Sequence, residues 1–311
     1  MEANNSQIGG SSVRKINDRV IFVQVLVALF LCINFTLVTT FFMKDYFYTT
    51  MRYILFAITL LSDCTFLFLT DTLLVMSYFY FAIEMWPCLI MFIMLSVYTF
   101  VTPVTLTAMT LERYVAICMP LRHAELCSTR SALYCILIIH GLSSVPCIII
   151  LSIFFSTATL SIFRQNNVCT SDVFTHQTWQ RHFRSAISQF YFLIMFIIIV
   201  FCYVKIMKVA KAASGENKKS TWKGLRTVIL HAFQLLLCLT QMWCPFIEAA
   251  VLKINFRLFI DVRYFDYIMF NLVPRSLSPL IYGLRDDKFF LALKYYAFCG
   301  FVNNQSLDLT N

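Results

Sequence analysis

The sequence predicts an all-α membrane protein, a bundle of seven transmembrane helices followed by a short amphipathic eighth helix. Of its 311 residues, 59% are apolar and 13% are charged, and 32 are Phe while only 7 are Gly. This composition is too apolar for an ordinary soluble protein. A helix crosses the hydrocarbon core in roughly 20 residues. Seven apolar stretches reach that length, and we expect spans at 20–43, 53–83, 85–119, 131–160, 183–207, 225–252 and 264–284.

Lysine and arginine are most frequent in the segments that follow the first, third, fifth and seventh spans. Because such residues accumulate on the cytoplasmic side, we expect the amino terminus outside the cell and the carboxyl terminus inside. The chain then divides into an extracellular tail (1–19), a transmembrane bundle (20–284) and a cytoplasmic tail (285–311). Inner loops that face anionic lipid explain the net charge of +9, so no nucleic-acid partner is expected. No cleavable signal peptide is predicted, and the first span should act as an uncleaved anchor.

Polar side chains in the first two spans are expected to face the bundle interior. Asn34 lies inside the first span, where neighbouring helices are the best partners for an amide. Asp63 and Asp71 lie on roughly one face of the second span, and a carboxylate in hydrocarbon is costly. The alternative for Asp63 is a carboxylate that is paired for a purely structural purpose, but intramembrane acids more often mark function.

In the segment before the first span, Asn4-Asn5-Ser6 predicts a glycan acceptor at Asn4, although such triplets also occur by chance.

The third span ends in Glu112-Arg113-Tyr114, and the chain then breaks at Pro120. An acid and a base at the water boundary can pair strongly and still respond to a protein that docks beneath them, which suits a switch. The alternative is that Arg113 only reaches to the interface, as many terminal arginines do. These residues alone leave both interpretations open.

Cysteine positions predict one disulfide. Among the 12 cysteines, only Cys88, at the outer start of the third span, and Cys169, in the outer loop at 163–181, are expected outside the cell. The others fall in spans or on the cytoplasmic side, where thiols stay reduced, so a Cys88–Cys169 bridge is predicted.

The fourth span carries no recognisable chemistry. The fifth ends at Tyr203, after which lysines recur at one-turn spacing, as suits a lipid surface or an acidic partner.

The last two spans carry a histidine and an arginine that need explanation. His231 lies near the cytoplasmic end of the sixth span, either as a packed side chain or as a pH-tunable latch. Arg275 lies at the middle of the seventh span and needs a counter-charge, for which Asp63 is the deep carboxylate available. The segment at 284–296 is typical of an amphipathic helix on the inner leaflet. Cys299 beyond it is a weak candidate for palmitoylation.

Seven spans, an outer cysteine pair, Glu112-Arg113-Tyr114 and Pro279-Leu280-Ile281-Tyr282 together resemble rhodopsin-like G-protein-coupled receptors. Three stretches narrow the resemblance to vertebrate odorant receptors, and the whole chain resembles their divergent fish-type members. These stretches lie at 112–123, at 223–227 with His231, and at 279–286. The resemblance covers about 20–298.

The resemblance implies a G-protein switch at the inner end of the bundle. Arg113 would be released from Glu112 on activation and contact the G protein, while Tyr203 and Tyr282 rearrange around it. The switch set comprises Glu112, Arg113, Tyr114, Tyr203, His231 and Tyr282, and the polar core set comprises Asn34, Asp63, Arg275, Ser278 and Pro279. The family has Asn where this chain has Ser278, a departure from the family pattern.

Asp63 matches the family's sodium-binding position. Because Arg275 lies one turn before Pro279, at the level expected for Asp63, we expect its guanidinium to occupy the sodium site and to pair with Asp63 directly. A fixed charge would then replace an exchangeable one.

The resemblance implies an odorant receptor in the plasma membrane of a sensory cell, which binds a small odorant and activates a heterotrimeric G protein. No cofactor or metal is expected, and an enzyme is unexpected because no nucleophile, base and orienting group converge in the motifs. A non-olfactory receptor for a lipid or peptide is the alternative. A seven-span transporter or channel is a further alternative, but the chain shows no internal repeat.

The ligand pocket should be mostly apolar. Its expected lining residues are Met91, Leu95, Ser96, Thr99, Ile187, Tyr191, Met242, Phe246, Ile268 and Asn271.

Overall fold

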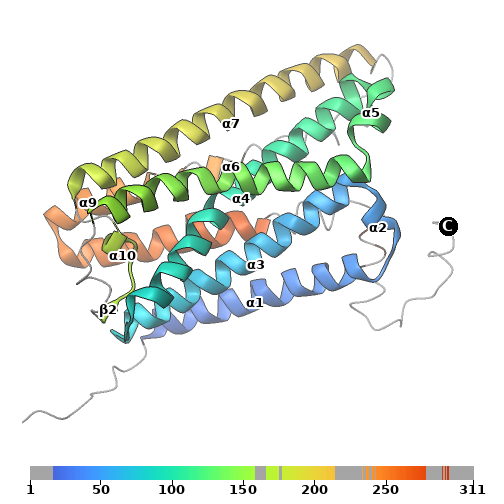
Figure 1. Ribbon diagram of the computed structural model, residues 1–311. Helices are drawn as coiled ribbons and strands as arrows, with labels where there is room; N and C mark the ends of the chain where they lie inside the picture. The colour runs from blue at the N-terminus through green and yellow to red at the C-terminus, as the bar shows by residue number, and fades with distance from the viewer. Residues whose placement is uncertain are drawn as a thin grey trace, which may run out of the picture.

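The computed structural model describes residues 17–157, 166–174, 177–213 and 243–277, together with residues 233, 236, 237, 240, 241, 289, 291 and 293. Five long helices dominate this part of the chain (Figure 1): α1 (Asp18–Phe42), α3 (Met51–Tyr78), α4 (Met85–Cys118), α6 (Thr129–Thr157) and α7 (Thr178–Ala213). The shorter elements are α2 (Tyr46–Thr49), β1 (Ala82–Ile83), α5 (Pro120–Leu126), β2 (Asn167–Val168), η2 (Ser171–Phe174), α9 (Cys244–Ile254), α10 (Phe256–Asp266) and the π-helical η3 (Tyr267–Leu272).

The five long helices are apolar and long enough to cross a membrane. They confirm the first five expected spans. α9 lies in the sixth expected span, and η3 with the helical residues up to 277 lies in the seventh. The expected eighth helix falls mostly on residues outside the described ranges and stays a prediction.

Three span boundaries differ clearly from the prediction. One is the end of the fifth span, expected at 207, because α7 continues to Ala213. Local backbone structure explains the other two. The second span was expected to continue to residue 83, but α3 ends at Tyr78 because Tyr80 has a left-handed backbone (φ 54°). Ala82–Ile83 then forms β1, which pairs antiparallel with β2. The fifth span was expected from residue 183, but α7 begins at Thr178. The side chain of Gln180 accepts the backbone N–H of Gln177 at 3.2 Å, which caps this earlier start.

The segment expected as an outer loop before residue 264 is instead the helix α10. The Asn255 side chain accepts the backbone N–H of Arg257 at 2.8 Å and so caps the amino end of this helix. This segment is too polar to be recognised as part of a span, because it contains Arg257, Asp261 and Arg263. Charged residues are nevertheless compatible with a capped helix at the membrane boundary.

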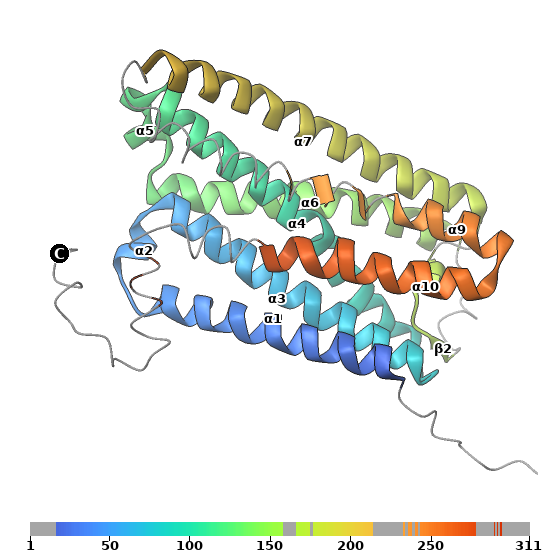
Figure 2. The same cartoon turned by 180° about the vertical axis from the view of Figure 1, so that it is seen from behind.

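α4 is the central helix of the bundle. It contacts α3, α6 and α7, while α1 packs on α3. Figures 1 and 2 show these helices side by side, with α10 and η3 running alongside α1 and α3. A cluster formed by Val23, Val27, Leu67 and Leu272 joins α1, α3 and η3. This arrangement brings the seventh helix next to the second span, which carries Asp63.

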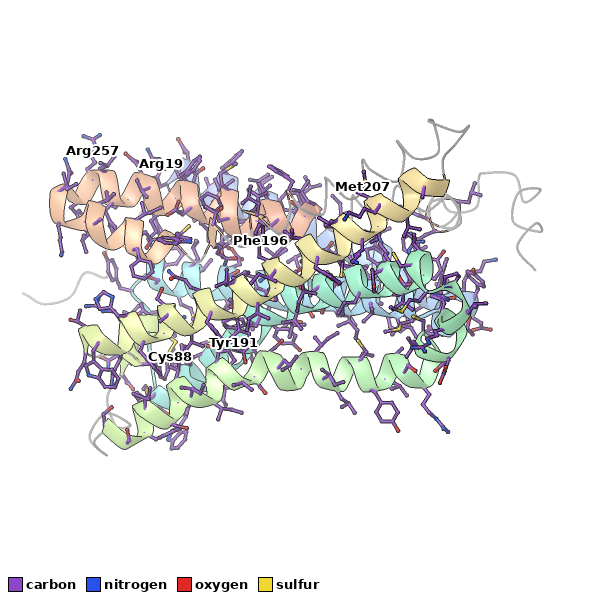
Figure 3. All side chains as sticks on the ribbon, turned by 90° about the horizontal axis from the view of Figure 1, so that it is seen from above. Arg19, Cys88, Tyr191, Phe196, Met207 and Arg257 are labelled. Atoms are coloured by element: carbon purple, nitrogen blue, oxygen red, sulfur yellow. A yellow bond between two sulfur atoms is a disulfide. The ribbon has the colours of Figure 1, made fainter. Side chains whose placement is uncertain are left out.

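Large apolar side chains cover the outside of the bundle. Phe35 of α1, Leu137 of α6 and Phe190 of α7 are all exposed, with many others on the same helices. A soluble protein rarely exposes so much apolar surface, whereas a membrane protein presents it to lipid. Arg19, Arg257 and Cys88 lie at one end of the bundle, and Met207 lies at the other (Figure 3).

Candidate functional site

The predicted disulfide is present at the end of the bundle that carries Arg19 and Arg257. Cys88 at the start of α4 is bonded to Cys169, with 5.5 Å between their Cα atoms. The bridge holds the β2–η2 segment over α4 and α6. In that segment, Phe174 stacks on Phe92 with 4.2 Å between ring centroids and meets Phe154 edge-on at 5.2 Å. The disulfide and the aromatic rings therefore fix the loop over this mouth of the bundle.

Removing the disulfide should destabilise the protein. In a Cys88→Ser/Cys169→Ser double variant, the loop closed by a sequence separation of 81 residues is free in the unfolded chain. We expect a loss of about 2–5 kcal/mol of stability and a lower yield at the cell surface, measured by thermal unfolding and by surface labelling. Cys32→Ser, at an exposed free thiol, is the matched control. Equal melting temperatures for the double variant and the wild type would contradict the structural role of the bridge.

A buried ion pair lies at the centre of the bundle. Arg275 Nη1 lies 2.8 Å from Asp63 Oδ1, and the two side chains are 4% and 0% exposed. The pairing expected from the sequence is therefore present. A charge this deep in hydrocarbon requires a partner, because the desolvation cost is recovered only through close, hydrogen-bonded contact.

Three further groups contact the guanidinium or its acid. Thr102 on α4 donates to Asp63 Oδ1 at 2.8 Å and accepts from Arg275 Nη1 at 2.9 Å. A hydroxyl is able to do both at once. Arg275 Nη2 donates to the carbonyl of Tyr98 at 3.5 Å, and its Cζ lies 3.4 Å from the ring centroid of Phe66. The cation thus meets an acid, a hydroxyl, a carbonyl and an aromatic face at the position where the sequence predicted a tethered charge.

The end of α4 opposite the disulfide carries the predicted switch. Glu112 Oε1 lies 3.4 Å from His123 Nε2 of α5, a contact the sequence analysis missed. Tyr203 of α7 is buried in a cluster with Ile199 and Ile206, against which Tyr114 and Cys118 pack. The structure therefore brings together Tyr114 and Tyr203, two residues of the predicted switch set. Arg113, which directly precedes Tyr114 in the sequence, is half-buried.

α5 places a thiol in the same region. Cys127, directly after α5, is half-buried. Burial raises the pKa of the Cys127 thiol, and the nearby Glu112 carboxylate and Cys135 raise it further. These effects favour the protonated thiol.

The predicted pocket residues that the structure describes are distributed over several parts of the bundle. Tyr191 of α7 meets Phe100 edge-on at 5.5 Å, and Met91 packs with the cluster around the disulfide. Thr99 donates to the carbonyl of Leu95 in its own helix at 2.7 Å. Ile268 instead packs towards α1 and α3, so its assignment to a pocket shared with Met91 lacks support from packing.

The sixth and seventh helices meet through polar groups near the predicted pocket. The Gln241 side-chain amide donates to Oδ1 of the Asn271 side chain. Phe246 stacks with His182 of α7, with 6.3 Å between ring centroids. The buried acid Asp266 was not predicted from the sequence.

Several residues predicted from the sequence lie outside the described ranges. These residues are Asn4, His231, Met242, Ser278, Pro279, Tyr282 and Cys299.

Most of the chain is similar in sequence to a known protein family. The 7 transmembrane receptor (rhodopsin family) sequence family matches residues 33–282. The chain belongs to the rhodopsin family of seven-transmembrane receptors. It is therefore a multi-pass membrane protein with a seven-helix bundle, and its family is one of receptors and not of enzymes. The predicted membership is confirmed.

Individual relatives of this rhodopsin-family receptor differ in how much of the chain they match. Odorant receptor 131-2 of Danio rerio is 44% identical over 297 residues, which is 95% of this chain and 91% of that protein. Galanin receptor 2a of Danio rerio is 28% identical over 64% of this chain and 55% of its own length. Galanin receptor type 2 of Homo sapiens is 28% identical over 60% of this chain and 48% of its own length.

Proposed function

We propose that this chain is an odorant receptor of the plasma membrane that binds a small odorant and activates a heterotrimeric G protein. The observation that carries the proposal is the 44% identity to an odorant receptor over nearly the whole chain. The proposed topology places the tail at 1–19 outside the cell, the bundle at 20–284 in the membrane and the tail at 285–311 inside. The distribution of lysine and arginine and the position of the disulfide support this orientation.

In this proposal the odorant binds in the outer half of the bundle and favours an active state. It must bind that state more tightly than the inactive state to have any effect. Apolar groups line the region between α4 and α7, including Phe100, Phe192 and Tyr191. A small ligand with few polar groups suits such surroundings.

The G protein would dock at the inner end, where α4 continues into α5. Leu121, at the second position of α5, is 98% exposed, although it follows directly on an apolar span. Next to it are the exposed Arg122 and the half-exposed His123. A protruding leucine flanked by basic groups fits a partner with an apolar pocket and acidic rim, which supports the assignment of Arg113 to the coupling surface.

The ion pair supports a second part of the proposal, that Arg275 acts as the cation of the polar core. The resemblance to the family implies a sodium site at Asp63, and here a guanidinium contacts this carboxylate at 2.8 Å. Thr102 binds both groups. A tethered charge cannot exchange with solvent, so we expect signalling that does not depend on the sodium concentration.

A ligand screen tests the proposed function. Cells that express the receptor together with a cyclic AMP reporter are exposed to water-soluble and volatile compounds, with Arg113→Ala as the coupling-deficient control. We expect at least one small molecule to give a saturable response that the control lacks. A response to galanin-like peptides alone would favour the peptide-receptor alternative, which the two galanin receptors suggest at 28% identity. Ligand-dependent current without G protein would favour a channel.

A further inference from the structure

Three side chains able to bind a metal lie close together at the inner end of the bundle. One belongs to α4, one to α5 and one to the residue directly after α5. The Glu112 carboxylate, the His123 imidazole and the Cys127 thiol each place a ligand atom within 4.8 Å of the other two. Two of these atoms, Glu112 Oε1 and His123 Nε2, are 3.4 Å apart. The proposed receptor mechanism gives no role to Cys127 and uses His123 only as a basic group beside Leu121.

Local structure brings the three groups together. Glu112 lies near the end of α4, and Pro120 at the start of α5 sets the new helical direction. The Cys127 N–H donates to the His123 carbonyl at 2.9 Å, so the helical turn includes both residues. Side chains four residues apart share one helix face, and zinc sites use this spacing repeatedly.

We propose that Glu112, His123 and Cys127 bind a zinc ion, with water as the fourth ligand. In a tetrahedral zinc site with bonds of about 2.0–2.3 Å, the ligand atoms lie about 3.3–3.8 Å apart. The Glu112–His123 distance already meets this requirement, and the thiol must move by at most about 1 Å. Imidazole and thiolate select zinc over magnesium and calcium, which prefer sets of oxygen ligands.

Binding changes both the protonation and the mobility of this region. The S–H bond of Cys127 is replaced by a Zn–S bond, and the proton passes to water. The His123 side chain is 40% exposed while that of Glu112 is 9% exposed, so the ion enters from the solvent side of α5. Coordination ties α5 to α4 and neutralises the Glu112 charge next to Arg113 in sequence. Zinc should therefore also change G-protein activation, a consequence that rests on the proposed function.

Zinc titration of the purified receptor tests the site. The full chain, without a histidine tag, is reconstituted in lipid nanodiscs, treated with chelator and titrated calorimetrically with Zn²⁺. We expect one saturable site, whose affinity falls by at least about tenfold in His123→Ala and in Cys127→Ser. Cobalt in place of zinc should give a sulfur-to-metal charge-transfer band in the wild type that Cys127→Ser lacks.

Matched controls separate the site from general effects on folding. Cys118→Ser and His140→Ala remove a free half-buried thiol and a half-buried imidazole elsewhere in the bundle, and both should bind zinc as the wild type does. Thermal unfolding of each variant without metal verifies that it is folded. No saturable binding to the wild type, or equal affinity in the wild type and Cys127→Ser, would overturn the proposal. Because binding is measured without odorant or G protein, such a failure leaves the proposed function untouched.

Discussion

Arg275→Met should destabilise the receptor more than any single surface substitution. The variant leaves Asp63, which is fully buried, without its guanidinium partner at 2.8 Å. Removing one member of a buried ion pair typically costs about 3–5 kcal/mol, because the remaining charge stays desolvated. We expect a lower melting temperature in detergent and a lower yield at the cell surface. Arg257→Met, at an exposed arginine of α10, is the matched control and should change neither (Figure 3).

Neutralising both partners should restore much of that loss. In Asp63→Asn/Arg275→Met no unpaired charge remains, and an apolar chain packs beside the Phe66 ring that the guanidinium contacts. Arg275→Lys should be intermediate, since an ammonium group lacks the fork with which Arg275 binds Asp63 and Thr102 through Nη1 and Tyr98 through Nη2. If the double variant is less stable than Arg275→Met, the interaction between the two charges is not what stabilises the core.

Arg113→Ala should abolish G-protein activation and leave surface expression largely intact. The side chain is half-buried at the boundary of the bundle, so its loss creates no deep unpaired charge, and Glu112 retains His123 as a neighbour. In the proposed mechanism, in contrast, the active-state contact with the G protein needs the guanidinium. The measurement is agonist-driven cyclic AMP production at matched surface density.

The control for this experiment is Arg130→Ala, at an exposed arginine near the start of α6 on the same side of the bundle. It removes equal charge without touching the switch and should signal normally. Normal signalling by Arg113→Ala would contradict the assignment of the Glu112-Arg113-Tyr114 segment to coupling.

The features that the sequence predicts well are those governed by the membrane as a solvent. Length and apolar composition alone located α1, α3, α4, α6 and α7, because hydrocarbon admits few other structures. The Asp63–Arg275 pair was predictable for the same reason, since two opposite charges at one depth must meet. The Cys88–Cys169 bridge followed from the position of the cysteines relative to the membrane.

Features that depend on tertiary contact or on capping were not predictable. Hydroxyls and aromatic rings are frequent in all the spans, so nothing in the sequence marks Thr102 or Phe66 as partners of Arg275. The contact of Glu112 with His123 depends on the direction that α5 takes after Pro120. α10 was missed because Arg257, Asp261 and Arg263 interrupt the apolar pattern, while the cap at Asn255 is a signal of only one residue.

Thermal unfolding in sodium and in potassium chloride of equal ionic strength tests most directly whether Arg275 is the cation of the polar core. The wild type should melt at the same temperature in both salts, because its guanidinium already occupies the place beside Asp63. Arg275→Ala opens that place and should melt at a higher temperature in sodium than in potassium, as expected when an ion binds only the folded state. A wild type that sodium stabilises, or an Arg275→Ala variant indifferent to it, would contradict the replacement of the ion by the arginine.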